Sequence, residues 1–343
     1  MTDFLGADLP IIQSPMAGVQ DSTLTIAVSS AGGLGSLPCA LLSIDEIRAE
    51  LNAVTQQNDK PFSSNFFCHK APEIDNKRES KWRAELKPYF DELGIDVDNI
   101  PTRPKFNPFN HQIADVLEDY KPAVVSFHFG LPSADLVARV KSWGSTVIAS
   151  ATTVAEAQWL EANGADGIIA QGLEAGGHRG IFLSEDLTTQ VGTFSLLPQI
   201  VKAVKLPVIA AGGIADAAGV AAALSLGASA VQVGTAYLLC TETNTSQIHR
   251  NALKSEASQH TAITNLFSGR PARSIVNRIM REIGPINPNT SAFPLALNTI
   301  SAVKKQAEST GVGDFSSLWC GQNATGCKEI SAAEMTMALA AKL

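Results

Sequence analysis

The stretch LPVIAAGGIADAAGVAAALSLGASAVQVGTA (residues 206–236) decides the fold class. It predicts a short apolar strand at 208–210, a glycine turn, a helix at 216–226 and a second apolar strand at 230–233. Apolar runs without polar alternation are typical of strands that are buried on both faces of a parallel sheet. The stretch therefore indicates a strand–helix–strand unit of an α/β protein.

The same unit recurs along the 343-residue chain. Strands are expected at 11–13, 34–36, 62–66, 123–127, 146–149, 167–170, 208–210 and 230–233. Helices are expected between them at 23–31, 43–57, 133–143, 154–163, 194–204 and 216–226. Eight strands that alternate with helices favour a (β/α)₈ TIM barrel, and an open doubly wound sheet is the alternative.

The pattern divides the chain into three parts. Residues 1–239 are expected to form the barrel, in which the charged, proline-rich segment 70–121 elaborates the third strand–helix unit. Residues 240–311 are polar, and we expect a small, mainly helical second domain over the C-terminal mouth of the barrel. Such a lid excludes water and completes a site. Residues 312–343 are expected to return and pack on the barrel.

Composition argues against several classes of partner. The 26 basic and 33 acidic residues give a net charge of −7, whereas nucleic acids and anionic membranes require a basic surface. The uncharged run from Ala217 to Thr241 contains three glycines and a glutamine, so we interpret it as helix, turn and strand, not as a membrane span. The N-terminus lacks the pattern of a secretory signal. The five cysteines include no C-x-x-C pair, and the histidines show no metal-ligand spacing, so a cytoplasmic protein without a metal is expected.

Glycines at the ends of the last two strands predict a phosphate site. Gly212 and Gly213 follow strand 208–210, and Gly234 follows strand 230–233. In a TIM barrel, loops at these positions commonly bind phosphate, and glycine lets backbone N–H groups approach the anion closely. One glycine pair alone would indicate only a tight turn, whereas two consecutive strand ends favour phosphate binding.

The loop QGLEAGGHRG (171–180) follows the sixth strand and carries the candidate catalytic residue. Gln171 stands at the strand end, where its amide could bind the edge of a heterocycle. Gly176 and Gly177 make room for a planar ligand. His178 follows them, and an imidazole that titrates near neutrality suits the deprotonation of a carbon acid or the orientation of its anion.

Other residues at the predicted mouth are weaker candidates. The segment QSPMAG (13–18) could lay its backbone against a flat ring, and an amide after the third strand could bind a ligand or cap a helix. A histidine after the fourth strand could line the site or be an ordinary packed residue. These candidates are Pro15, Met16 and Ala17, then Asn65, then His128.

Together these motifs resemble the nitronate monooxygenases, formerly called 2-nitropropane dioxygenases, in the class that needs no nicotinamide cofactor. The resemblance rests on QSPMAGV (13–19), AGGLGS (31–36), NFFCH (65–69), SFHFG (126–130), AQGLEAGGHRG (170–180), AAGGI (210–214) and VQVGTA (231–236). It covers residues 8 to 240 and continues more weakly through SGRPARSIVNR (268–278). The GGHRG loop is its most specific part.

The resemblance implies an FMN-dependent enzyme that uses O₂ to oxidise alkyl nitronates to carbonyl compounds and nitrite, with one-electron transfer to the flavin. Whether neutral nitroalkanes are also substrates stays open. His178 matches the catalytic histidine of the family, which abstracts the α-proton or holds the nitronate. The implied flavin contacts are Asn65, Gln171, Gly176, Gly213, Gln232, Val233, Gly234 and Thr235.

The lid segment AFPLALNTIS (292–301) departs from the family pattern. Some relatives carry tyrosines and a lysine where this chain has Phe293, Leu297 and Ser301. We expect Phe293 to contact the substrate, and this more apolar lid should favour an alkyl nitronate over one that carries a carboxylate.

Two alternatives remain at this point. The first is an NAD(P)H-dependent quinone or enoyl-thioester reductase of the same superfamily, with nearly identical flavin contacts. The second is a barrel that binds a phosphorylated metabolite without redox chemistry. The sequence leaves open whether the protein is a monomer or a homodimer.

Overall fold

The computed structural model describes residues 4–102 and 106–343, in which eight parallel strands form one sheet. The strands are β1 (Ile11–Gln13), β2 (Gly35–Pro38), β3 (Phe62–Phe67), β4 (Val124–His128), β5 (Thr146–Ala151), β6 (Gly167–Gln171), β8 (Val208–Ala211) and β9 (Ala230–Val233). Their order in the sheet is β1-β9-β8-β6-β5-β4-β3-β2. Each strand begins within one residue of its predicted start.

Backbone hydrogen bonds close this sheet into a barrel. The N–H of Gln13 donates to the carbonyl of Leu34 (3.0 Å), and the N–H of Leu34 donates to the carbonyl of Ile11 (2.8 Å). Leu34 directly precedes β2, so these bonds join the two edges of the sheet. A doubly wound sheet would leave both edges open, and the closure therefore confirms the predicted (β/α)₈ barrel.

Alternate strand residues pack into two separate clusters. Ile12, Ile148 and Ile209 belong to a cluster built from the strands and the N-terminal segment. Val147 and Ile168 belong to a larger cluster that includes the helices. Because successive side chains of a strand point to opposite faces, the first cluster fills the barrel and the second attaches the helices to it.

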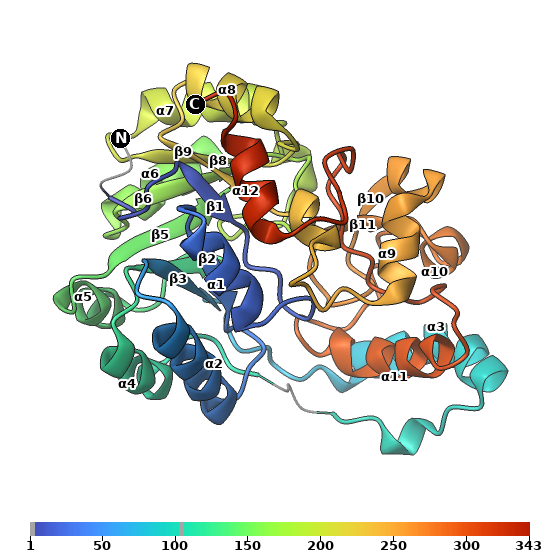
Figure 1. The fold of residues 1–343 in the computed structure, drawn as a ribbon. Coiled ribbons are helices and arrows are strands. Elements are labelled where there is room, and N and C mark those ends of the chain that lie inside the picture. The colour runs from blue at the N-terminus through green and yellow to red at the C-terminus, as the bar shows by residue number, and fades with distance from the viewer. Residues whose placement is uncertain (1–3, 103–105) are drawn as a thin grey trace.

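Eight helices pack with the strands in this larger cluster (Figure 1). They are α1 (Ser22–Ser30), α2 (Ile44–Gln57), α4 (His111–Tyr120), α5 (Ala134–Ser142), α6 (Val154–Ala162), α7 (Thr193–Ala203), α8 (Ala217–Ser225) and α12 (Ala332–Ala340). Local sequence sets their starts: Ser43 and Glu46 form a reciprocal capping box at α2, and the Asp216 side chain accepts the N–H of Gly219 at α8. Within the described ranges, no helix has both the length and the apolar character that a membrane span requires.

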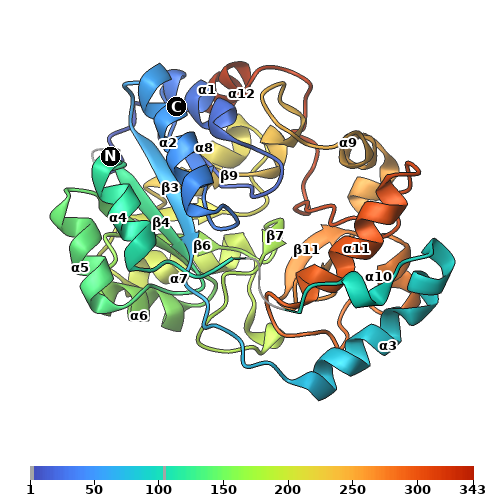
Figure 2. The same cartoon turned by 90° about the horizontal axis from the view of Figure 1, so that it is seen from below.

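A second lobe lies beside the barrel mouth (Figures 1 and 2). Its elements are α3 (Asn76–Leu93), α9 (Gln247–Lys254), β10 (Thr261–Thr264), β11 (Ala272–Ile275), α10 (Arg278–Glu282) and α11 (Ala296–Glu308). β11 pairs antiparallel with β10 on one side and with β7 (Gly177–His178) on the other. The short strand β7 is part of the loop that follows β6, so the sheet of the second lobe includes the candidate catalytic loop.

The packing of α3 corrects one expectation. Trp82 and Phe90 of this helix share an apolar cluster with Phe267, Ile300 and Phe315, whereas the sequence placed all of segment 70–121 in the barrel. α4, at the end of the same segment, does pack on the barrel. The segment is thus divided: its first helix belongs to the core of the second lobe and its second helix to the core of the barrel.

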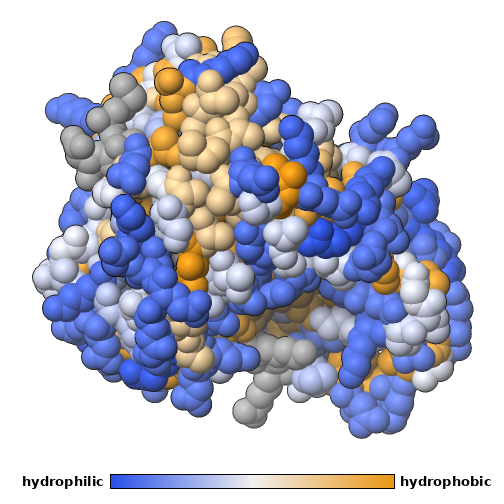
Figure 3. Space-filling model, viewed as in Figure 1, coloured by the Kyte–Doolittle hydropathy of each residue, from blue (hydrophilic) through white to orange (hydrophobic). Residues whose placement is uncertain are grey.

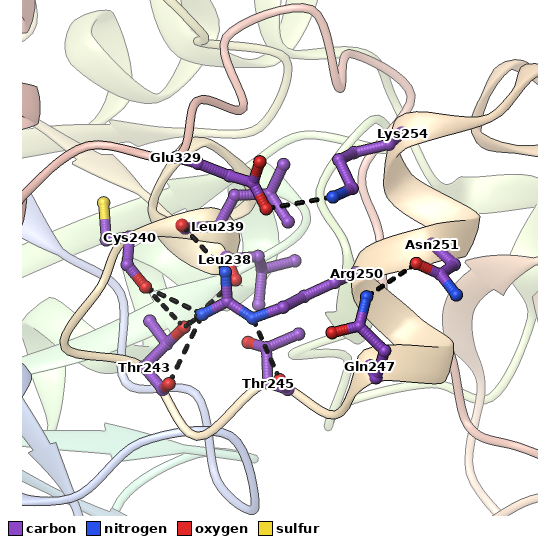
Figure 4. A network of polar contacts seen from close by, with 10 residues as sticks. All are labelled: Leu238, Leu239, Cys240, Thr243, Thr245, Gln247, Arg250, Asn251, Lys254 and Glu329. Atoms are coloured by element: carbon purple, nitrogen blue, oxygen red, sulfur yellow. Dashed lines mark hydrogen bonds and ion pairs between the residues drawn. The ribbon is translucent and has the colours of Figure 1, made fainter.

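Arg250 of α9 stabilises the connection between barrel and second lobe (Figure 4). Its guanidinium donates to the carbonyls of Leu239 (3.0 Å), Cys240 (2.9 Å) and Thr245 (3.1 Å) and to the hydroxyl of Thr243 (2.8 Å). One side chain thus holds the segment that leads from the last barrel strand to α9 of the second lobe.

Candidate active site

A cavity of about 530 Å³ lies where the carboxyl ends of the barrel strands meet the second lobe. The face shown in Figure 3 is hollowed between the two lobes, with hydrophobic residues at depth. The predicted residues among its lining are Pro15, Met16, Ala17, Asn65, His128, Gln171, Gly176, Gly177, His178, Gly212, Gly213, Gln232, Gly234, Thr235 and Phe293. Segments far apart in the sequence therefore meet at one site.

Val233 is the one predicted residue outside this lining. Its side chain is buried in the cluster between strands and helices, because it alternates with Gln232, which faces the cavity. Its carbonyl accepts the N–H of Ser14 (2.8 Å). The side chain of Val233 therefore faces away from the cavity, and a flavin contact of this residue stays a prediction.

His178 lies at the junction of the two lobes. In β7 it pairs with Ala272 of β11. Its Nε2 is 2.8 Å from the hydroxyl of Ser268, and its ring lies 5.7 Å from Phe293 and 5.5 Å from Trp319, centroid to centroid. Backbone pairing, a hydrogen bond and aromatic contacts thus fix the imidazole in the cavity wall.

The surroundings of His178 keep its imidazole neutral. Burial lowers its pKa to about 3, and repulsion from His128 and His69, when these are protonated, and from Arg270 acts in the same direction. Desolvation disfavours the charged form of an imidazole, and nearby cations disfavour it further. At neutral pH the ring therefore has a lone pair available to accept a proton.

His128 supports the backbone of His178. Its Nε2 lies 3.2 Å from the carbonyl oxygen of His178, and its Nδ1 lies 3.1 Å from the hydroxyl of Ser150. Because a carbonyl only accepts, Nε2 carries the ring hydrogen and Nδ1 accepts from Ser150. Burial lowers the pKa of His128 to about 3, so this ring is also neutral.

Gln171 and two arginines hold the backbone of the catalytic loop. Gln171 was predicted from the sequence, whereas the arginines were missed. Gln171 donates to the carbonyl of His178 (2.9 Å). The fully buried Arg179 donates to the carbonyls of Gln171 (2.8 Å) and Gly172 (2.7 Å), and Arg273 donates twice to the carbonyl of Leu173. An arginine offers five donors in a fixed planar geometry, which suits it to hold several carbonyls of one loop.

The predicted phosphate loops are joined by a C-terminal segment. Gly212 (φ 116°) and Gly213 (φ 74°) adopt backbone conformations that favour glycine. Asn323 donates to the carbonyl of Gly213 (3.1 Å), and the N–H of Gly321 donates to the hydroxyl of Thr235 (2.9 Å). Both C-terminal residues line the cavity. They were missed in the sequence, where the glycine in WCGQN (319–323) was the available signal.

Glu174 occupies the N-terminus of α7. Its carboxylate accepts the backbone N–H and the hydroxyl of Thr193, at 2.8 Å from Oε2 in both cases. A helix N-terminus is a common anion site, and here a side chain of the protein itself fills it. The loops at 212–213 and 234–235 therefore stay as the candidate phosphate sites.

Phenylalanines from the barrel and from the second lobe form an apolar wall of the cavity. Phe106, Phe129 and Phe293 are buried in one cluster, against which Phe67 and Leu297 pack. Leu297 and Ser301, both from the lid segment, line the cavity together with Phe293. The cavity thus combines a polar floor at the strand ends with an apolar wall.

The remaining reactive residue types give no second centre. Burial raises the pKa of Cys240, Cys320 and Cys327 to about 12, so these thiols stay protonated. In residues 4–102 and 106–343, no group of three His, Cys, Asp or Glu side chains is placed to hold a metal ion.

Comparisons with known proteins agree with this geometry. Residues 1–342 match the family model described as Nitronate monooxygenase. Curated nitronate monooxygenases from Paraburkholderia phytofirmans and Pseudomonas aeruginosa are 43% and 41% identical to the chain. The matches cover 99% and 100% of this chain and 93% and 98% of those proteins.

Solved structures give the same result. The structure of nitroalkane oxidase from Streptomyces ansochromogenes superposes with a TM-score of 0.91 at 36% identity, covering 100% of this chain and 97% of that one. FabK from Thermotoga maritima superposes with a TM-score of 0.75 at 28% identity, covering 99% and 94%. The chain belongs to the nitronate monooxygenase family.

Proposed function

We propose that the protein uses FMN, bound in the cavity at the barrel mouth, to oxidise alkyl nitronates with O₂ to carbonyl compounds and nitrite. The observation that carries this proposal is the position of His178, between the glycine loops of the barrel and the phenylalanine wall. Membership of the family and similarity to a nitroalkane oxidase support it.

The residues at the cavity floor fit FMN. The volume of about 530 Å³ lies within the range of small-molecule sites. Backbone loops at glycines suit a phosphate, and amides at the strand ends suit the polar edge of a flavin. The residues proposed to hold it are Pro15, Met16, Ala17, Asn65, Gln171, Gly176, Gly177, Gly212, Gly213, Gln232, Gly234 and Thr235. When bound, FMN supplies the one-electron acceptor that the side chains of the protein lack.

Ser268 sets which nitrogen of His178 carries the ring hydrogen. The Ser268 hydroxyl has one hydrogen and two possible acceptors, Nε2 of His178 (2.8 Å) and the carbonyl of Arg270 (3.2 Å). When it donates to Nε2, the ring hydrogen is on Nδ1. When it donates to Arg270, Nε2–H donates to Ser268 and the lone pair is on Nδ1. The free Nδ1 thus offers a hydrogen-bond donor in the first case and a lone pair in the second.

This histidine suits a preformed nitronate better than a neutral nitroalkane. A general base works best when its pKa is close to the working pH, and the pKa of His178 is about 3. Its neutral N–H can still donate a hydrogen bond to the oxygens of a nitronate. We therefore propose that His178 mainly orients the nitronate and abstracts the α-proton of neutral nitroalkanes only slowly.

The aromatic wall fits the alkyl part of the substrate. Phe67, Phe106 and Phe293 line the cavity, and the rings of Phe67 and Phe293 lie 6.0 Å and 5.7 Å from the ring of His178, centroid to centroid. A dry site strengthens each hydrogen bond that the substrate makes.

The test begins with the purified protein and its visible absorption spectrum. We expect a flavin spectrum and, after denaturation, a released compound with the mass of FMN. Propyl-2-nitronate should give oxygen uptake and nitrite, whereas NADH should not bleach the flavin. Bleaching by NADH without nitrite formation would support the reductase alternative. A colourless protein that gains no activity with added FMN would support the non-redox alternative.

A further inference from the structure

Arg270 is a half-buried cation that forms no ion pair with a carboxylate among the described residues. Its guanidinium carbon lies 4.3 Å from the ring centroid of Phe129 and 5.9 Å from that of Phe293. Its Nη1 is buried and has no hydrogen-bond partner. None of the ion pairs between described residues includes it. Buried polar atoms normally have a hydrogen-bond partner, so the unpartnered Nη1 of a cation indicates a place where an anion binds.

His69 adds a second group without a partner on the same side of the cavity. It is 5% exposed, and neither ring nitrogen has a hydrogen-bond partner. Its ring lies 4.9 Å from Phe293, which also contacts His178. Arg270 and His69 thus both contact the aromatic wall near His178, and both have N–H groups that can attract an anion.

The nearest acidic groups do not neutralise this region. Glu185 and Glu156 act on Arg270 only through longer-range attraction, without an ion pair. The carboxylate of Glu156 accepts from the N–H and hydroxyl of Thr152 (2.7 Å each) and from the N–H of Phe182 (2.7 Å). The Glu156 carboxylate is thus held by other donors, and the Arg270 guanidinium stays without an ion-pair partner among the described residues.

We propose that Arg270 is a specificity-determining residue whose charge, acting through the phenylalanine wall, makes the cavity favour an anionic nitronate over the neutral nitroalkane. The inference rests on the proposed function and adds a residue to it that the family resemblance did not assign. Arg270 is not itself part of the cavity lining, so it acts at a distance and not by contact.

The effects of Arg270 on the two substrate forms differ in sign. A bound nitronate carries a full negative charge, which the guanidinium attracts through a low-dielectric wall. Proton abstraction from a neutral nitroalkane creates a nitronate and an imidazolium together. Arg270 stabilises the first and destabilises the second, and it lowers the pKa of His178 accordingly. The two contributions oppose each other, so the neutral substrate gains little.

Arg270→Met removes the charge but keeps an unbranched apolar side chain against Phe129. In this variant we expect the KM for propyl-2-nitronate to rise about tenfold at nearly constant kcat, while the KM for neutral 2-nitropropane stays within about threefold. The acid limb of the pH profile for 2-nitropropane should move to higher pH. Arg270→Lys, which retains a cation over the ring, should restore most of the nitronate KM.

Nitrate, a planar and unreactive anion, provides a binding test that needs no turnover. Calorimetry on the holoprotein should show nitrate binding that weakens about tenfold in Arg270→Met and in Arg270→Gln, and much less in Arg270→Lys. Arg139→Met is the matched control. It removes an arginine that lies 5.9 Å from the ring of Trp143 on the outside of the barrel and pairs with Asp115 and Glu118, and it should leave nitrate binding unchanged.

The outcomes separate this inference from the proposed function. Nitrate binding that depends on Arg270, in a protein without nitronate turnover, would sustain the anion site and reject the proposed function. Normal turnover with equal nitrate affinity in wild type and both neutral variants would reject the role of Arg270. If neither neutral variant folds, the wild type alone decides: nitrate must then inhibit propyl-2-nitronate oxidation competitively, and failure to compete overturns the inference.

Discussion

The imidazole of His178 is neutral, paired with Ser268 and enclosed by aromatic rings, and these properties define a test at the scale of one residue. His178→Asn keeps a hydrogen-bond donor of similar size but removes the basic nitrogen. We expect the variant to retain FMN and most of its kcat with preformed propyl-2-nitronate, and to lose about 10²-fold or more with neutral 2-nitropropane. Steady-state nitrite formation with both substrates measures this.

His111→Asn is the control for that experiment, because this exposed histidine of α4 lies outside the cavity lining and pairs only with Asp135. It should leave both activities unchanged. Equal losses with the two substrates in His178→Asn would contradict a role as base and leave only an orienting role.

The lid residues predict a preference among nitronates. Phe293 and Leu297 give the cavity an apolar wall, and the Lys304 ammonium, which also lines the cavity, lies 3.8 Å from the Glu308 carboxylate. A carboxylate on the substrate would have to displace this pair or lie against phenylalanine, which costs desolvation energy. We expect kcat/KM to be about tenfold higher for propyl-2-nitronate than for the nitronate of 3-nitropropionate. A ratio below one in a direct comparison would contradict it.

At this scale, the residues that sequence reasoning found are those whose chemistry is visible locally. Gly212 and Gly213 are adjacent glycines directly after an apolar run, so they are easily recognised. Ser268 and Trp319 are common residue types in unremarkable contexts, and only the pairing of β7 with β11 and the return of the C-terminal segment bring them to His178.

At the scale of elements, the attachment of α9 to the barrel depends on the hydrogen bonds of one arginine. Arg250 donates to four backbone carbonyls and one hydroxyl of the segment that precedes its helix (Figure 4). Arg250→Met leaves these acceptors without their donor, and we expect the free energy of unfolding to fall by about 3 kcal/mol. Urea unfolding followed by circular dichroism measures this.

Lys254→Met on the same helix is the matched control. Its ammonium makes a half-exposed ion pair with Glu329 (3.0 Å), and such pairs contribute about 1 kcal/mol or less. A loss in Lys254→Met as large as in Arg250→Met would show that any substitution on α9 has this effect, and that the carbonyl contacts have no special role.

Strands and their order followed from the sequence, whereas the partner of α3 did not. A buried parallel strand is recognised by its own apolar run, so the predicted starts of β1 to β6, β8 and β9 lie close to the observed ones. The apolar face of α3 indicates that the helix packs against other elements, but it does not identify these elements. Its partners Ile300 and Phe315 lie more than 200 residues further along the chain, and no local pattern in 70–121 predicts a contact with them.

At the scale of the whole molecule, the site depends on two cores that fold from interleaved segments. The barrel core supplies the strand ends, the second core holds α3 and α11, and the phenylalanine cluster is separate from both. The contact between them is where the histidines are buried. Burial of these histidines links the stability of the entire fold to pH.

Stability should fall as the pH falls from about 6.5 toward 4.5, before most carboxylates titrate. Burial lowers the pKa of His69 and His249 to about 4 and of His128 and His178 to about 3, while the unfolded chain keeps values near 6.5. Between the two values the unfolded chain binds more protons, so each histidine decreases the free energy of unfolding by about 1.4 kcal/mol per pH unit. Thermal unfolding of the holoprotein at pH 7.5 and 5.0 measures the effect.

His69→Phe replaces a ring without hydrogen-bond partners by an apolar one. Between pH 7.5 and 5.0, the free energy of unfolding of this variant should fall by about 2 kcal/mol less than that of the wild type. Equal losses in the variant and the wild type would show that His69 is protonated in the folded protein.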